Sequence, residues 1–443
     1  MLGSLMLLSR SLAALIPALS FVALVSLVAA CGERSSPTGS TPPQATSAVT
    51  AATSATSAAS AAPVGPDPAR GAKLVTQFEC ARCHDGVPGA PPRPAMAAET
   101  QPDSKHCVHC HQAIRDGHFR APRAEATQRW RKNVELLCDV PSLAGVGRLQ
   151  RGWVEGFLLR PVDLRPRLAP SMPRLELTPE QARDIAAFLV PEAGPSAAAP
   201  VASLERGEAL FEERGCMSCH LYSGALPPPP AGKGRPDERG ISVAMRLAPD
   251  LRHARARMTP PVVAAWLRDP RSIKPDTLMP AVPLNEDEIA ALVRFVLTAP
   301  LAPVEPPVRP ARLPVLARKV HYEEVKQRVF NKVCWHCHSD ADYAIGDGGP
   351  GNTGGFGFRP RGLNLGAYEG IASGSLDDED ERRSVFEPMA DGSPRLLASL
   401  LARQAEEAGG EGALRGMPLG LPALSPEEIQ LVESWVAQGH LPD

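Results

Sequence analysis

Eight of the ten cysteines lie in four C-x-x-C pairs, and a histidine directly follows each pair. Random placement at this composition would give roughly 0.006 such five-residue motifs per chain. In a C-x-x-C-H motif the two thiols form thioether bonds with the vinyl groups of haem, and the histidine becomes the proximal ligand of the iron. The motifs therefore predict four haem c groups per chain. The predicted attachment residues are Cys80, Cys83, Cys107, Cys110, Cys216, Cys219, Cys334 and Cys337, and the predicted proximal ligands are His84, His111, His220 and His338.

Two other uses of paired cysteines compete with haem. Two C-x-x-C pairs can bind zinc tetrahedrally, and the pairs at 80/83 and 107/110 have a tolerable spacing for such a site. Zinc does not require a histidine after every pair, however, and the pairs at 216/219 and 334/337 stand alone. A disulfide or a thioredoxin-like redox motif does not require the histidine either. We therefore favour haem at all four motifs.

The elements that must position these motifs lie in three parts of the chain. Residues 32–68 are mostly Ser, Thr, Ala and Pro, a composition that cannot pack a core and that predicts a disordered tether. Breaks rich in proline or alanine at 191–203 and 298–316 divide the remainder. We call the resulting parts the first segment (69–190), the second segment (204–298) and the third segment (318–443).

The three segments open and close in the same way, which indicates a degenerate internal repeat. A short amphipathic helix is expected before the C-x-x-C-H that opens each segment, over 69–79 in the first. Near the end of each segment, a Met-Pro pair precedes a capping box, in which Glu or Gln follows the capping residue three positions on. The pairs and boxes are Met172-Pro173 with Thr178–Gln181, Met279-Pro280 with Asn285–Glu288, and Met417-Pro418 with Ser425–Glu428. Apolar residues at helical spacing follow each box and predict three closing helices.

Each segment, with its leading helix, C-x-x-C-H, later methionine and closing helix, resembles a class I cytochrome c domain. The resemblance implies a mainly α fold of three consecutive cytochrome c-like domains, in which the closing helix crosses the leading helix. The motif at 107–111 is then an insertion, so that the first domain is dihaem and the other two are monohaem. The third segment, which contains Leu363-Asn364-Leu365, resembles the variant common in planctomycete-type cytochromes.

The resemblance also implies sixth ligands for three irons. Met172, Met279 and Met417 fit the family position of the axial methionine, whose thioether raises the potential and closes the iron to substrate. The alternative role of any one methionine is to fill a core. Competing ligands are Met96 in the first segment, Met245 and Met258 in the second, and Met389 or His321 in the third.

The second motif has no leading helix and no Met-Pro pair of its own. We favour His118 as its sixth ligand, seven residues after His111, with His106 and His109 as alternatives. A second imidazole would give this haem a lower potential. Met172 could instead serve this haem, because it lies 61 residues after His111 whereas Met279 lies 59 after His220. We keep Met172 with the first haem, to which the helix at 69–79 belongs.

The N-terminus predicts export. Residues 1–30 combine Arg10 with a long uncharged apolar run, as in a signal peptide. Small residues before Cys31 resemble the lipobox of bacterial lipoproteins, which implies a lipidated Cys31 and a membrane anchor. An uncleaved membrane helix is the alternative, because the run could just span a bilayer. Gly32 after the cysteine favours the outer membrane over the inner. A lipidated Cys31 and an uncleaved membrane helix would both place the rest of the protein outside the cytoplasm.

Together these features predict an electron carrier and no enzyme, with redox proteins as partners. A net charge of −2 argues against nucleic-acid binding. The chain could also be a subunit of a respiratory or extracellular electron-transfer complex. The alternative is a multihaem oxidoreductase, peroxidase-like, with an open iron at the second haem near His118, His109 and Asp116. Cys138 is expected to be a buried thiol, with a reactive or cross-linking group as the alternative. The acidic run 377–381 is expected to be a solvated loop or a docking site for a basic partner, and the glycine-rich stretch 346–357 a flexible loop.

Overall fold

The fold is described from a computed structural model of the 443-residue chain. The described residues are 65–90, 106–119, 140–162, 164–166, 172–192, 197–225, 242–275, 277–340, 349–410 and 414–442, with residues 127, 128, 131, 134 and 168. All of them belong to one compact unit, Pro63–Asp443. The predicted signal peptide, Cys31 and the body of the tether lie outside the described residues, as do Met96 and Cys138.

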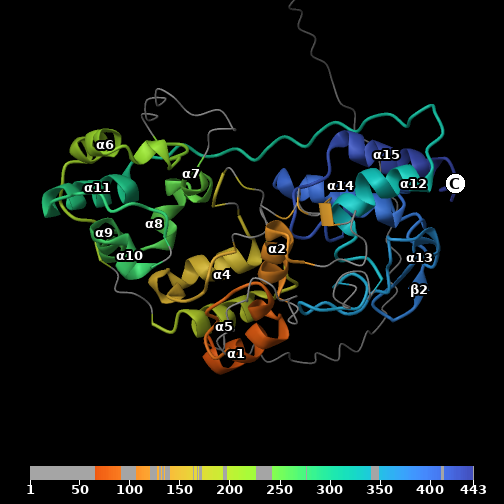
Figure 1. Ribbon diagram of the computed structural model, residues 1–443, viewed down its shortest axis with the longest axis horizontal. Helices are drawn as coiled ribbons and strands as arrows, with labels where there is room; N and C mark the ends of the chain where they lie inside the picture. The colour runs from red at the N-terminus through yellow and green to blue at the C-terminus, as the bar shows by residue number, and fades with distance from the viewer. Residues whose placement is uncertain are drawn as a thin grey trace, which may run out of the picture. The chain divides into compact units, whose positions relative to one another are not determined.

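The described residues are mainly helical (Figure 1). The α-helices are α1 (Pro68–Gln77), α2 (Cys107–Asp116), α4 (Arg151–Leu159), α5 (Pro179–Leu189), α6 (Leu204–Glu213), α7 (Val243–Leu247), α8 (Ala254–Arg257), α9 (Pro260–Arg268), α10 (Pro270–Ile273), α11 (Glu286–Thr298), α12 (Tyr322–Val325), α13 (Tyr368–Ala372), α14 (Arg395–Glu407) and α15 (Pro426–Ala437). A π-helix, η7 (Lys326–Cys334), continues α12, and short 3-10 turns are η1 (Cys80–Arg82), η3 (Val146–Arg148), η4 (Cys216–Ser218) and η6 (Leu251–His253). The only strands among the described residues, β1 (Ser375–Leu376) and β2 (Arg382–Arg383), pair antiparallel with Ser375 opposite Arg383.

The first segment is built on the crossing of α1 and α5 (Figure 1). Helix α1 begins after Asp67, whose carboxylate accepts from the backbone N–H groups of Ala69 and Arg70. Helix α5 begins after Thr178 with both hydrogen bonds of the predicted capping box. At the crossing, a Cβ on Gly71 would lie 2.1 Å from the carbonyl oxygen of Asp184, so only glycine permits the helices to approach this closely.

The second segment repeats this crossing with α6 and α11. The capping box at Asn285 is formed, and α11 follows it directly. A Cβ on Gly207 would lie 2.2 Å from the carbonyl oxygen of Ala291. Gly207 and Gly71 each lie nine residues before the first cysteine of a motif, so the two crossings are placed alike relative to the motifs that follow them.

In the third segment, α15 packs against α12 and the π-helix. The capping box at Ser425 precedes α15, so all three predicted boxes and closing helices are confirmed. Trp435 and Phe330 are buried in the apolar cluster between these helices, with ring centroids 6.3 Å apart.

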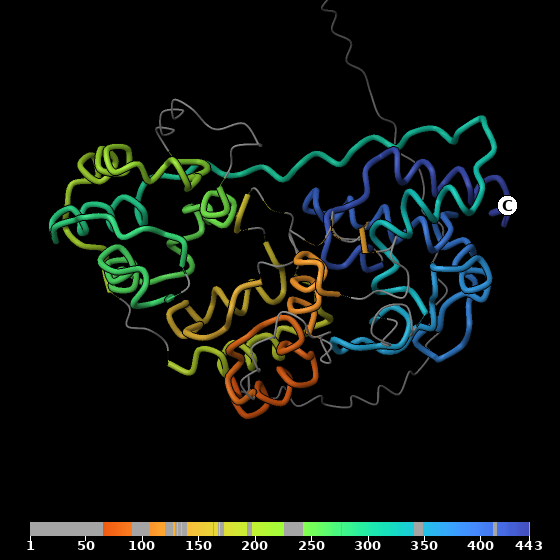
Figure 2. Tube along the Cα trace, viewed as in Figure 1, coloured from red at the N-terminus to blue at the C-terminus, as the bar shows by residue number. Residues whose placement is uncertain are grey.

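The three largest apolar clusters among the described residues follow the same division of the chain, one in each segment. Residues 302–316, which join the second segment to the third, contain no helix or strand and run as an extended trace (Figure 2). None of the helices that the structure describes is both long enough and apolar enough to cross a membrane.

Candidate haem-attachment sites

Three of the four C-x-x-C-H motifs lie at the end of a leading helix. The motif at Cys80 forms the 3-10 turn η1 after α1, and the motif at Cys216 forms η4 after α6. The residue before each turn has a left-handed backbone, with φ of 51° at Glu79 and 71° at Gly215. The motif at Cys334 begins on the last residue of the π-helix. In these three motifs the N–H of the histidine donates to the carbonyl of the first cysteine, at 2.9–3.0 Å.

The histidines of these three motifs are held in the same way. Nδ1 of His84 lies 2.7 Å from the carbonyl oxygen of Pro141, and Nδ1 of His220 lies 2.9 Å from that of Pro249. Nδ1 of His338 lies 3.3 Å from the carbonyl oxygen of Leu363. A carbonyl can only accept, so Nδ1 carries the proton and the lone pair of the neutral ring is on Nε2. An imidazole oriented by its second nitrogen is the usual form of a histidine that binds metal.

The carbonyl that holds each histidine opens a similar tripeptide. The three tripeptides are Pro141-Ser142-Leu143, Pro249-Asp250-Leu251 and Leu363-Asn364-Leu365. In each, the leucine N–H returns a hydrogen bond to a carbonyl at or just after the histidine: Asp85 at 2.8 Å, Leu221 at 2.9 Å and His338 at 2.8 Å. The position of these supports was not predicted from the sequence. Their shared pattern, a Ser, Asp or Asn before Leu, could have been noticed as a further part of the repeat.

Burial favours neutral rings at two of these sites. It lowers the pKa of His84 more than the carbonyl of Pro141 raises it, and it lowers the pKa of His338 more than the backbone hydrogen bonds with Leu363 and Gly351 raise it. A neutral imidazole is the state that can bind iron. Around His338 the packing is tight, because a Cβ on Gly351 would lie 2.1 Å from the ring.

The eight motif cysteines are thiols, and none of them is in a disulfide. Burial raises the pKa of Cys80 to about 11 and that of Cys334 to about 12. A thioredoxin-like motif requires the opposite, a lowered thiol pKa that provides a thiolate at neutral pH. Cys80 and Cys334 are therefore poor nucleophiles, which argues against a dithiol redox centre at these two motifs.

The zinc alternative also finds no support among the described residues. A tetrahedral site would require the sulfurs of the first two pairs to converge. Cys83 and Cys107 are hydrogen-bonded, and this contact raises the pKa of Cys83. No three of the four cysteines, however, form a group with mutually close ligand atoms within the described part of the chain.

The second motif has a different local structure from the other three. Cys107 to His111 lie inside α2, which begins after His106, and the ring of His106 accepts from the N–H of His109. The ring of His111 lies 6.0 Å from that of His336, inside the fourth motif. The predicted ligand His118 follows the left-handed Gly117 that ends α2, and it is exposed.

Asp85, His106 and His109 form a compact polar group beside this helix. Nε2 of His106 lies 3.6 Å from the carboxylate of Asp85 in a ring that is only 2% exposed. Nδ1 of His106 already accepts a backbone N–H at 3.1 Å, so in the neutral ring Nε2 carries the proton. This is the reverse of the orientation at His84. In this form the proton on Nε2 faces the carboxylate of Asp85 at 3.6 Å, too far for a hydrogen bond, and Nε2 has no other hydrogen-bond partner.

Met279 is the most clearly oriented of the predicted axial methionines. Its sulfur lies 2.9 Å from Nε1 of Trp266 on α9, so the indole N–H donates to it. The competing Met258 instead packs against the apolar clusters of the second segment, with Val263 and Ile289, as a core methionine does. Met245 lies on α7.

Met172 and Met417 are both partly buried at the edge of an apolar cluster, Met172 in the first segment and Met417 in the third. The N–H of Met417 donates to the carbonyl of Ser399 at 2.9 Å. The competitors in the third segment lie elsewhere: His321 is the exposed residue before α12, and Met389 lies in a turn closed by Ser393.

Two half-buried arginines of the second segment test whether a haem fits there. The Nε atoms of Arg255 and Arg257 are buried without a hydrogen-bond partner, whereas Nη2 of Arg255 donates to the hydroxyl of Tyr222 at 2.9 Å and to the carbonyl of Ala299 at 2.7 Å. Burial lowers the pKa of Arg257 to about 10, and its guanidinium lies 6.0 Å from the ring of Trp153. A buried cation is costly unless an anion accompanies it. A haem supplies two propionate carboxylates, so the chemistry of these residues fits the group.

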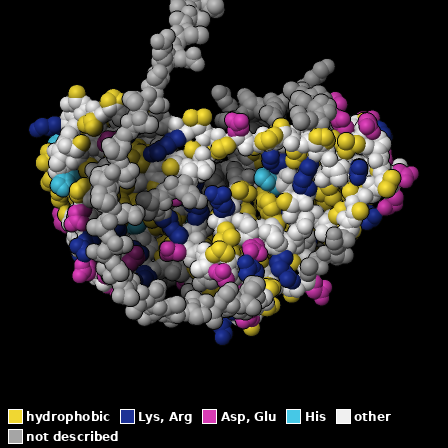
Figure 3. All heavy atoms as spheres, turned by 180° about the vertical axis from the view of Figure 1, so that it is seen from behind, with side chains coloured by type: hydrophobic (Ala, Val, Ile, Leu, Met, Phe, Trp, Pro, Cys, Tyr) yellow, Lys and Arg dark blue, Asp and Glu magenta, His cyan; other side chains and the backbone are white. Residues whose placement is uncertain are grey.

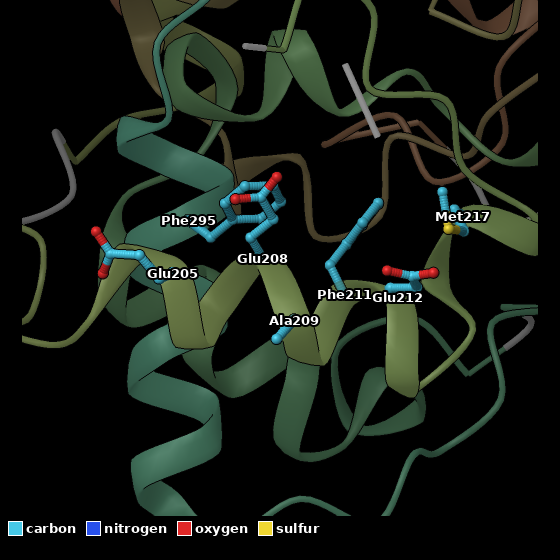
Figure 4. A pocket seen from close by; sticks show the side chains of 7 residues that line it. All are labelled: Glu205, Glu208, Ala209, Phe211, Glu212, Met217 and Phe295. Carbon is cyan, nitrogen blue, oxygen red and sulfur yellow. The ribbon is translucent and has the colours of Figure 1, made fainter. Parts of the chain in front are cut away.

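The hollow beside helix α6 is not this site. It has a volume of about 240 Å³ and is lined by Glu205, Glu208, Ala209, Phe211, Glu212, Met217 and Phe295 (Figure 4). Met217 lies between the two motif cysteines, but neither those cysteines nor His220 contribute to the lining. Three glutamates of α6 lie around it, and their carboxylates are visible in Figure 4.

The surface of the described residues mixes both signs of charge, as the face in Figure 3 shows. Residues 378–381 of the acidic run are exposed, as predicted for a solvated loop, whereas the side chain of Asp377 is only 12% exposed. The carboxylates of the run pair with arginines of the same segment: Asp377 and Glu381 with Arg383, Asp378 with Arg361, and Asp380 with Arg359. These pairs reduce the charge that the run could offer to a basic partner.

The glycine-rich stretch differs from the predicted flexible loop in its described part, 349–357. Gly351 packs against the ring of His338, and a Cβ on Gly357 would lie 2.3 Å from the ring of Phe78 in the first segment. The N–H of Phe356 donates to the carboxylate of Glu79 at 2.9 Å. The glycines are therefore used for close approach between two motif-bearing segments, and composition alone does not distinguish this from flexibility.

Comparison with known proteins agrees with the geometry of the second segment. The family model of cytochrome c matches residues 204–300, which include the motif at Cys216, the supporting Pro249 and Met279. No curated protein and no solved structure gave a match to the chain. The match and the mainly helical fold support a c-type cytochrome with covalently bound haem c, and a role in haem-based electron transfer.

Proposed function

We propose that the protein is a tetrahaem c-type cytochrome that transfers electrons between redox proteins. The observation that carries the proposal is the common support of three motif histidines. His84, His220 and His338 each direct Nδ1 to a backbone carbonyl, one in each of the three segments, and this places the lone pair of the neutral ring on Nε2, the atom that would bind iron. The matched cytochrome c domain provides the reference for this arrangement.

Each site would hold its haem through the two thioethers of the motif and Nε2 of the histidine. Met172, Met279 and Met417 would supply the sixth ligands of the first, third and fourth haems, and His118 that of the second. Haem iron supplies one-electron chemistry when bound, and a thioether ligand favours the ferrous state. The chain would contribute the imidazoles, which burial keeps neutral at His84 and His338, and the side chains that close the sixth positions.

The proposed place of action is outside the cytoplasm. Lipidation at Cys31 would anchor the chain, and the 32–68 tether would allow its ends to lie roughly 30–35 Å apart on average, as expected for a flexible coil. Gly32 favours the outer membrane. The protein would act as a periplasm-facing carrier or as a subunit of a respiratory or extracellular electron-transfer complex.

A catalytic role at the second haem has less support. An enzyme would need acid–base groups beside an open iron. Of the candidates, Asp116 is paired with Arg115 at 2.8 Å, and this hydrogen bond lowers its pKa. A carboxylate held ionised in this way is a poor proton donor at neutral pH.

Low-temperature EPR of the oxidised protein distinguishes the two functions. Electron transfer predicts low-spin signals for all four irons, because every sixth position is occupied. A high-spin signal that integrates to about one haem per chain would favour the enzyme. Binding of cyanide or peroxide to the same iron would support that result.

A further inference from the structure

Residues 172–176 and 415–419, which carry Met172 and Met417 and which we call the methionine segments, are in direct contact although they lie far apart in sequence. The backbone N–H of Arg174, two residues after Met172, donates to the carbonyl of Leu419 at 3.3 Å. Its guanidinium Nη2 donates to the carbonyls of Gly416 and Pro418, at 3.5 and 3.3 Å. These two carbonyls flank Met417 on either side.

The contact is reciprocal. Nη1 of Arg415, two residues before Met417, donates to the carbonyl of Arg174 at 2.8 Å. Each arginine thus binds the backbone of the other methionine segment. Both side chains are mostly buried, with 21% exposure at Arg174 and 31% at Arg415.

Carboxylates hold both arginines in this arrangement. Glu406 on α14 lies 2.9 Å from Arg174 and also accepts the N–H of Gly416 at 2.7 Å. Glu176 lies 3.5 Å from Arg415. Hydrogen bonds from a charged guanidinium are stronger than those between neutral groups, so the two methionine segments are expected to move together and not independently.

The first and third segments also meet on the cysteine side of the two sites. The guanidinium of Arg82, within the first motif, lies 4.9 Å from the ring of Phe356. Phe356 belongs to the same glycine-rich stretch that packs against His338. Both the motif and the methionine segment of the first site therefore contact the third segment.

We propose that Arg174 and Arg415 are positioning residues that couple the sixth ligands of the first and fourth haems. The inference rests on the proposed function, because it assumes that Met172 and Met417 are axial ligands. Loss of either arginine should displace both methionines, whereas Met279, in the second segment, should not respond. The positions of the sixth ligands at the first and fourth sites would thus depend on each other, although the two sites lie far apart in the sequence.

Proton NMR of the reduced holoprotein tests the coupling. A methionine methyl bound to ferrous low-spin haem lies above the macrocycle, and its resonance is strongly shifted upfield. Three such resonances are expected, and the variants Met172→Leu, Met279→Leu and Met417→Leu assign them. In Arg174→Ala we expect the resonances of Met172 and Met417 to shift or disappear, and that of Met279 to remain. Intact mass confirms that all haems are still attached.

Two further variants make the result specific. Arg415→Gln removes the reciprocal bond from the other side and should move the same two resonances. Arg268→Ala removes an exposed arginine paired with Glu286 at 2.7 Å and should move none. A change confined to Met172 in Arg174→Ala, or no change in either arginine variant, would overturn the coupling alone. Fewer than three upfield methyls in the unmodified protein would overturn the axial assignments as well.

Discussion

Nε1 of Trp266 lies 2.9 Å from Sδ of Met279, so a tryptophan on α9 orients the sulfur of a methionine on the following loop. An indole nitrogen can only donate a hydrogen bond, so the sulfur of Met279 is the acceptor. The sulfur is thereby held at a defined place within the matched cytochrome c domain. Met258 has no such partner and is packed as apolar filling.

Replacement of Met279 by Leu should change one iron and leave its attachment intact. Leucine nearly conserves the volume, so packing should cost less than about 1.5 kcal/mol. Without the thioether, one iron should become high spin and its potential should fall. The long-wavelength absorption band of sulfur-ligated ferric haem should lose about a third of its intensity. Met258→Leu is the matched control, and loss of the band there in place of Met279→Leu would move the ligand to Met258.

Gly207→Ala should destabilise the second segment. The added methyl would meet the carbonyl of Ala291 at 2.2 Å, so α6 and α11 must separate, at a cost of about 1–3 kcal/mol. Gly152→Ala on α4 is the control, because a Cβ there meets nothing within 4 Å and alanine favours the helix by up to about 1 kcal/mol. Urea midpoints of the holoproteins measure both. Equal midpoints for the two variants would show that the crossing tolerates a side chain.

The local signals of the sequence predicted the helices well. The capping boxes at Thr178, Asn285 and Ser425 place helix starts within a few residues, because a cap satisfies backbone groups of its own first turn. The supports of the motif histidines were not predicted. Pro141 lies 57 residues from His84, and Pro249 lies 29 from His220, so no local pattern connects them.

Two further features could not be predicted from local sequence patterns: the helical structure of the second motif and the contact between the methionine segments. Residues Cys107–Asp116 form a helix capped by His106, although histidine is not a preferred capping residue. Arg174 donates to the carbonyls on either side of Met417, which lie more than 240 residues away in the sequence. Such contacts arise from the packing of whole segments and leave no mark on local composition.

Acid should weaken the first segment through Asp184. Its side chain is 1% exposed, it pairs with Arg70, and it accepts the N–H of Asp67 at 2.8 Å. The hydrogen bond from Arg70 holds the pKa of Asp184 below its ordinary value. Because the pKa of Asp184 is lower in the folded protein than in the unfolded chain, the ionised carboxylate stabilises the fold at any pH above the ordinary carboxyl pKa. This contribution to the free energy of unfolding is lost as the pH falls through the pKa of the folded state.

Asp184→Asn should therefore be less stable than the unmodified protein at pH 7, and its urea midpoint should fall less as the pH is lowered below about 4. Glu192→Gln, an exposed substitution with the same change in charge, is the control and should follow the unmodified curve. A midpoint for Asp184→Asn that falls as steeply as that of the unmodified protein would assign the acid sensitivity to other groups.

Replacement of both Cys216 and Cys219 by alanine should remove one covalent haem and no more. The remaining motifs lie in other segments and load independently, because attachment requires only the local C-x-x-C-H. Intact mass should fall by one haem in addition to the two sulfur atoms. A protein that keeps its full haem complement would show that this pair is not an attachment site.

Intact mass of the purified mature chain, together with its metal content, shows whether haem occupies all four motifs. We expect a red protein whose mass exceeds that of the polypeptide by four haems, with iron at four atoms per chain and no stoichiometric zinc. A colourless protein with the bare polypeptide mass, or one that holds zinc in place of iron, would contradict it.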